Sequence, residues 1–134
     1  MLGGAGLTAA NLPTINIASG GTLTATRYNA VGNVTLNGGT LTQSSTDTGT
    51  VLGYQFLGSV TATNTSGTSA ISSGNGTGNH LLGGATTTFS VTNAGGTLLV
   101  SNPLVDGSSN YPGAGSLNKT GPGKLTLGNN ANGS

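Results

Sequence analysis

The sequence predicts an all-β fold, a parallel β-helix (β-solenoid), that forms a single domain over residues 1–134. Three observations lead to this prediction. The tetrad GGTL stands at 20–23, 38–41 and 95–98, short runs alternate apolar and polar residues, and no stretch keeps the spacing of an amphipathic helix. A phrase of turn and strand that recurs about every 20 residues is typical of a solenoid, whose coils stack so that their strands pair in parallel.

The spacing of these copies sets the expected number of coils. The copies begin at Gly20, Gly38 and Gly95, so the second interval is close to three times the first. With about 20 residues per coil, the chain would form about six or seven coils. Strands are expected at 14–17, 22–26, 33–37, 57–65, 68–72, 87–93, 97–101, 115–119 and 124–128. Between them, 43–53, 73–84 and 102–115 are expected to be projecting loops, because these segments lack alternation and are rich in turn residues.

The corners of each coil are expected at glycines. In LNGGTLTQ (36–43), Leu36 would end one strand and Leu41 would enter the core from the next, while Gly38 and Gly39 turn the chain where a side chain would be crowded. The same reasoning assigns a structural corner or turn role to eight residues: Gly20, Gly21, Gly38, Gly39, Gly95, Gly96, Gly121 and Gly123.

The composition excludes several classes of protein. Glycine, threonine, asparagine and serine supply 26, 23, 15 and 14 of the 134 residues, and the formal net charge is +1. A thick core is hard to build from such residues, and a disordered chain usually has a higher net charge. Three basic side chains (Arg27, Lys119 and Lys124) are too few to bind nucleic acid. No run of about 18 apolar residues exists, so no membrane insertion is expected.

The titratable residues do not form a recognisable catalytic pattern. Asp47 and Asp106 are the only acids, whereas glycosidases that share the β-helix fold generally use paired carboxylates. His80 is expected to be an exposed loop residue and Lys119 a solvent-facing residue of a strand. We therefore expect no enzyme activity, no catalytic or cofactor-binding residue, no cofactor and no metal site.

One segment resembles a known family. The segment GSLNKTGPGKLTLGNN (115–130) resembles the signature of the autotransporter-associated β-strand repeat, GxLxKxGxGxLxLxGxN, and YNAVGNVTLNGGTLT (28–42) resembles the region that precedes this signature. The resemblance implies a right-handed parallel β-helix that is exported to the bacterial surface or beyond, as a passenger region or adhesin. The chain departs from the family at 129–134, where NNANGS stands in place of a tyrosine- and glycine-containing stretch.

The ends of the stack suggest how such a protein would work. Neither terminus offers an amphipathic helix or a cluster of charges that would cap a sheet edge, and open edges recruit further strands. We expect an extracellular or cell-surface structural protein, which stacks head-to-tail with copies of itself into a filament or forms one segment of a longer adhesin. The alternative is a binding module for surface glycans or ice, which would use threonine and asparagine faces or the three loops. The TxT units are not repeated at a constant coil position, which disfavours a regular ice-binding plane.

Overall fold

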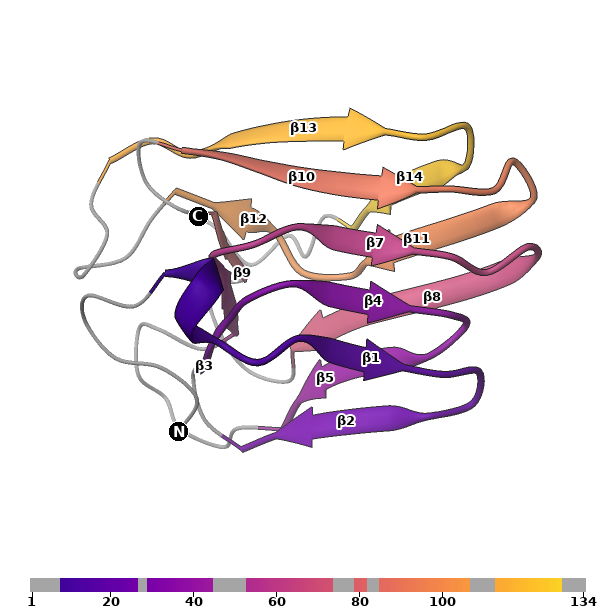
Figure 1. The fold of residues 1–134 in the computed structure, drawn as a ribbon, viewed down its shortest axis with the longest axis horizontal. Helices are drawn as coiled ribbons and strands as arrows, with labels where there is room; N and C mark the ends of the chain where they lie inside the picture. The colour runs from indigo at the N-terminus through magenta and orange to yellow at the C-terminus, as the bar shows by residue number, and fades with distance from the viewer. Residues whose placement is uncertain are drawn as a thin grey trace.

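A computed structural model describes residues 8–26, 29–44, 53–73, 79–81, 85–106 and 113–128 (Figure 1). Sheet A contains, in order, β1 (Ile15–Ile17), β4 (Val34–Leu36), β7 (Val60–Ala62), β10 (Thr86–Val91) and β13 (Ser116–Thr120). Sheet B contains β2 (Thr22–Ala25), β5 (Thr40–Gln43), β8 (Gly67–Ser73), β11 (Gly96–Val100) and β14 (Lys124–Leu127). Sheet C contains β3 (Asn29–Val31), β6 (Tyr54–Phe56), β9 (Asn79–Leu81) and β12 (Leu104–Val105).

The chain visits the three sheets in turn, so each strand pairs with the strand three places along. All of these pairs are parallel. Within the described residues, the only helical element is one turn of 3-10 helix, η1 (Ala9–Asn11), beside the stack (Figure 1). The prediction of an all-β fold with stacked parallel strands is confirmed.

The length of chain between successive levels is not constant. Along sheet A, Ile15 pairs with Val34, then Val60, then Phe89, then Lys119, so each step is longer than the one before. The expected six or seven short coils are not confirmed, since sheets A and B have five described strands each. The wide interval between the second and third GGTL copies spans two long steps, because one strand, β8, lies between β5 and β11.

Sheet C was not anticipated from the sequence, and two of the expected loops are corrected by it. Strand β9 lies within 73–84 and β12 lies within 102–115. These strands are too short to show alternation, and each is held by pairing with its neighbour in the stack rather than by local propensity. Of 43–53, Gln43 belongs to β5, and 45–52 lie outside the described residues.

The core is formed by inward-pointing residues of all three sheets. Alternate strand residues point inward, so that Thr87, Phe89 and Val91 of β10 are buried while their neighbours are half-buried or exposed. The ring of Phe56 from sheet C packs edge-to-face against the ring of Phe89 from sheet A, with the ring centroids 5.5 Å apart. It also stacks on the ring of Tyr54, with the centroids 6.5 Å apart. The buried hydrophobic cluster comprises Ile17, Val31, Val34, Leu36, Leu41, Tyr54, Phe56, Val60, Ala62, Ile71, Phe89, Val91, Leu98 and Val100.

Candidate assembly edges

One column of aliphatic side chains runs through the full height of sheet B. The register pairs Leu23 of β2 with Leu41, Leu41 with Ile71, Ile71 with Val100, and Val100 with Leu127 of β14. The three middle residues have no exposed surface, whereas Leu23 is 41% and Leu127 50% exposed. These two are the exposed large hydrophobic residues of the described chain. The column is therefore fully buried in its middle and exposed to solvent at both ends.

The open ends coincide with the free edges of the sheet. Strands β2 and β14 are the outermost strands of sheet B (Figure 1), and no described strand pairs with their outer sides. An outermost strand presents backbone N–H and C=O groups that can pair with another chain. Each edge thus combines backbone groups that no described strand pairs with an exposed apolar side chain at the end of the column.

The column of sheet A ends differently. Its members Ile15, Val34, Val60 and Phe89 belong to the core or pack against it, but the fifth position, on β13, is Lys119. Lys119 is exposed, and its Nζ donates hydrogen bonds to the carbonyl oxygens of Thr120 at 2.9 Å and Gly121 at 2.6 Å. Lys119 is an exposed strand residue, as expected, but its register with the buried Phe89 places it in the inward column, which the sequence did not indicate.

The eight glycines assigned to corners all lie where the chain passes from sheet A to sheet B. They are placed as follows: Gly20 and Gly21 between β1 and β2, Gly38 and Gly39 between β4 and β5, Gly95 and Gly96 at the start of β11, and Gly121 and Gly123 between β13 and β14. At Gly39 a Cβ would lie 2.7 Å from the carbonyl oxygen of Ala18 and 2.5 Å from Cγ2 of Ile17. The preceding level leaves no room for a side chain there.

A buried hydrogen-bond chain joins the corner between β4 and β5 to the corner between β7 and β8 in the next level. The backbone N–H of Gly38 donates to Oγ of Ser69 at 3.0 Å, and that hydroxyl donates to Oδ1 of Asn64 at 2.9 Å. The Asn64 amide in turn donates to the carbonyl oxygen of Gly67 at 2.8 Å. Asn64 is 3% exposed and Ser69 is fully buried. Neither residue was anticipated from the sequence, although the corner composition TNTSG was a signal for the asparagine.

The outer face of sheet A is a regular polar surface. The register aligns Asn16, Thr35, Thr61, Ser90 and Thr120 in one column. On sheet B, Oγ of Ser72 donates to Oγ1 of Thr42 on the adjacent strand at 2.8 Å. The TxT units do not repeat at a constant coil position. Strand pairing nevertheless places one hydroxyl or amide at the same position at every level of sheet A, although the chain segments between the levels differ in length.

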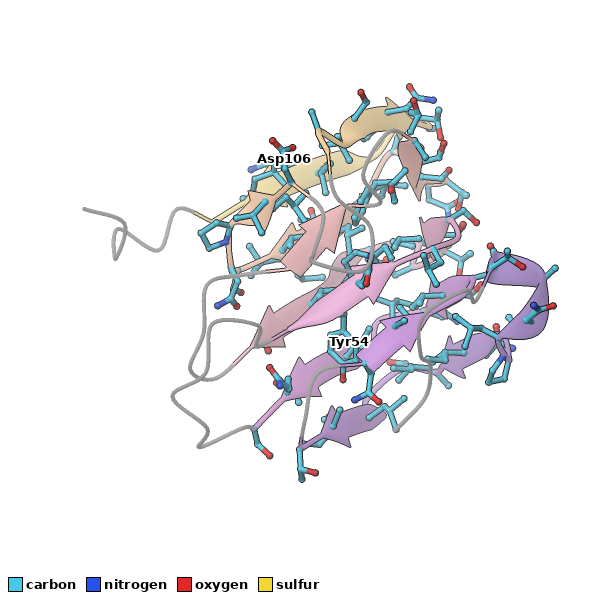
Figure 2. All side chains as sticks on the ribbon, turned by 90° about the vertical axis from the view of Figure 1, so that its left-hand side faces the viewer. Tyr54 and Asp106 are labelled. Atoms are coloured by element: carbon cyan, nitrogen blue, oxygen red, sulfur yellow. The ribbon has the colours of Figure 1, made fainter. Side chains whose placement is uncertain are left out.

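The candidate titratable residues do not converge among the described residues. Asp106 follows β12 at the end of the stack opposite β1 (Figure 2). Its Oδ1 accepts a hydrogen bond from the backbone N–H of Gly115 at 3.1 Å. Asp47 and Arg27 lie outside the described residues, as does the side chain of His80, whose backbone belongs to β9. No group of three His, Cys, Asp or Glu residues gathers in the described part of the chain.

Tyr54 is the described residue with the most perturbed acidity. Its ring lies inside the stack (Figure 2), and its hydroxyl donates a hydrogen bond to the carbonyl oxygen of Thr42 at 2.6 Å. Burial, which disfavours the phenolate, raises the pKa of Tyr54 to about 12. The hydroxyl is therefore a structural donor that stays protonated across the physiological range.

Comparison with known proteins gave no relative. No protein-family model, curated protein or solved structure matches the chain. Among the described residues, no helix has the length and apolar character needed to cross a membrane.

Proposed function

We propose that the chain is an extracellular structural β-solenoid of the bacterial surface, which works by stacking coils end to end. The stack would be wound right-handedly, as most parallel crossover connections are. The next coil would come either from another copy of the chain or from a longer adhesin of which this chain is a segment. The resemblance of 115–130 to autotransporter-associated repeats supports export. The proposal needs no catalytic group and no cofactor.

The single observation that supports stacking most strongly is the column Leu23–Leu41–Ile71–Val100–Leu127. A copy placed head-to-tail would set its Leu23 on Leu127 of the copy below, and the column would continue with the spacing that it has inside each copy. Complete burial of a leucine side chain is favourable by about 1.5–3 kcal/mol. Leu23 and Leu127 are each about half exposed, so burying the rest of both side chains at the contact contributes part of this free energy for each. New backbone hydrogen bonds between β14 and β2 would add about 0.5–1.5 kcal/mol each.

The test is the assembly state of the purified chain. We expect unbranched fibres by negative-stain microscopy and, from aligned fibres, a meridional reflection at about 4.8 Å, the spacing of paired strands. A head-to-tail contact does not close, so length should increase with concentration. A chain that stays monomeric at every concentration, or that forms only amorphous aggregate, would refute assembly between copies.

The polar column of sheet A supports a second candidate, a binding module for a ligand with a regular repeat. Asn16, Thr35, Thr61, Ser90 and Thr120 would offer hydroxyl and amide groups one strand spacing apart. A glycan array and a thermal-hysteresis measurement on the monomer distinguish glycan from ice. Thr61→Val keeps the side-chain shape and removes one hydroxyl of the column, so it should weaken either activity. If neither ligand registers on the wild-type chain, this candidate is wrong.

A further inference from the structure

Lys119 stands where the pattern of sheet A requires an apolar residue. The four preceding positions of its column are Ile15, Val34, Val60 and Phe89, and Phe89 directly beneath it is fully buried. A further coil would therefore add its own inward residue over Lys119. In head-to-tail stacking that residue is Ile15 of the next copy.

Such a coil would take the ammonium group out of water. Burying an unpaired charge is strongly unfavourable, and inward-pointing charged residues on an outermost strand are one way in which proteins prevent edge-to-edge pairing. Among the described residues at the opposite end, the strands β1 and β2 that would meet this edge contain no charged side chain to act as a counter-ion. The ammonium also already hydrogen-bonds the carbonyl groups of Thr120 and Gly121 where β13 ends.

Sheet B has no comparable obstacle, although its outermost strand also contains a lysine. Lys124 is aligned with Thr97 and Thr68 in a column whose members are half-buried or exposed, so a further coil would leave its side chain in solvent. The inward column of β14 ends instead in the exposed Leu127. The two sheets therefore have opposite effects on coil addition at the same end of the stack. Leu127 of sheet B favours the addition of a coil, and Lys119 of sheet A disfavours it.

We propose that Lys119 is a gate on coil addition: its charge weakens the head-to-tail contact through sheet A, so that the Leu127–Leu23 contact through sheet B must overcome it. The partner is a second copy of this chain, because the same molecule presents the apolar column at both ends. This inference rests on the proposed stacking function and names the residue that regulates it.

The experiment measures the critical concentration for assembly of Lys119→Met, which keeps an unbranched side chain only one heavy atom shorter and removes its charge. We expect Lys119→Met to lower that concentration at least tenfold relative to wild type, and Lys124→Met, the matched control, to change it less than twofold. Lys119→Gln is a second neutral variant, which should lower it in the same direction. Circular dichroism and urea unfolding of each monomer establish that the variants are folded.

The outcomes separate the gate from the function. If wild type assembles and both neutral variants at 119 match it, or if Lys124→Met accelerates assembly equally, the gate is wrong and stacking stands. If wild type stays monomeric and Lys119→Met assembles, the gate is supported and unassisted fibre formation by the wild-type chain is refuted. If no folded variant assembles, both proposals fail.

Discussion

Leu23 and Leu127 occupy the two ends of one column in sheet B, although they lie near opposite ends of the described chain. Their positions predict how assembly can be stopped. Leu23→Lys should block one end of the molecule and Leu127→Lys the other, since each places a charge at the edge where an apolar contact would form. Each variant alone should raise the critical concentration more than tenfold.

A mixture of these two variants provides a sharper test, because each keeps one intact edge. We expect sedimentation velocity to show dimers and nothing longer, in the wild-type background and in the Lys119→Met background. Thr61→Lys adds the same charge in the middle of the outer face of sheet A and should leave end-to-end assembly unchanged. Long fibres from either edge variant would show that copies do not meet through these leucines.

The same column predicts how stability depends on position. Leu41→Ala should cost about 2–5 kcal/mol, because it leaves a cavity in a fully buried site, and Leu127→Ala less than about 1 kcal/mol in the monomer. Urea unfolding followed by circular dichroism measures both. Equal losses of unfolding free energy for the two variants would contradict the buried interior and exposed end of the column.

The sequence was informative where a strand is long enough to show alternation. Leu36 and Leu41, on either side of NGG, were expected to belong to strands that face the core, and both are fully buried. The three GGTL copies open β2, β5 and β11, so the repeated tetrad marks the same corner of the stack at three levels.

The alignment of residues between successive levels of the stack could not be predicted from the sequence, because the chain segments that connect the levels differ in length. Sheet C consists of very short strands that are defined by their neighbours above and below. The inward place of Lys119 follows from its pairing with Phe89, which belongs to the preceding level and lies far away along the chain. The local sequence NKTG contains nothing that reveals this pairing.

Two corner glycines predict different losses for the same substitution. At Gly39 an added Cβ meets backbone and side-chain atoms of the preceding level, so Gly39→Ala should cost more than about 2 kcal/mol. Gly20 has φ +74° but nothing within 4 Å of the Cβ position, so Gly20→Ala should cost only the left-handed backbone penalty of about 1–2 kcal/mol. Thermal and urea unfolding compare them, and a smaller loss at Gly39 than at Gly20 would contradict the tight corner.

Replacing the buried Gln43 by an apolar residue should stabilise the fold. Its side chain is 1% exposed, and neither amide atom meets a hydrogen-bond partner among the described residues. Replacing a buried, unpaired polar group by an apolar group of similar shape removes a desolvation cost of about 1–3 kcal/mol. Gln43→Met should therefore raise the urea midpoint, while Gln43→Ala, which also loses volume, should raise it less or lower it. A lower midpoint for Gln43→Met would show that the amide is paired in solution.

Tyr54 predicts a loss of stability at high pH. The folded state holds its pKa at about 12, whereas the ordinary value of 10.0 applies to the unfolded chain. Between pH 10 and pH 12 the unfolded state releases this proton and the folded state keeps it, so the free energy of unfolding falls as the pH rises. Across that window the decrease should reach about 2–3 kcal/mol, and below pH 10 this residue should contribute no pH dependence.

Tyr54→Phe separates this effect from other alkaline transitions. The variant loses the hydrogen bond to the Thr42 carbonyl, which should cost about 1 kcal/mol at neutral pH. It also loses the titrating group, so its unfolding free energy should decrease less than that of wild type from pH 10 to pH 12. Urea unfolding at half-unit pH intervals measures both chains. Parallel curves for wild type and Tyr54→Phe would place the alkaline transition on another residue and would contradict the burial of this hydroxyl.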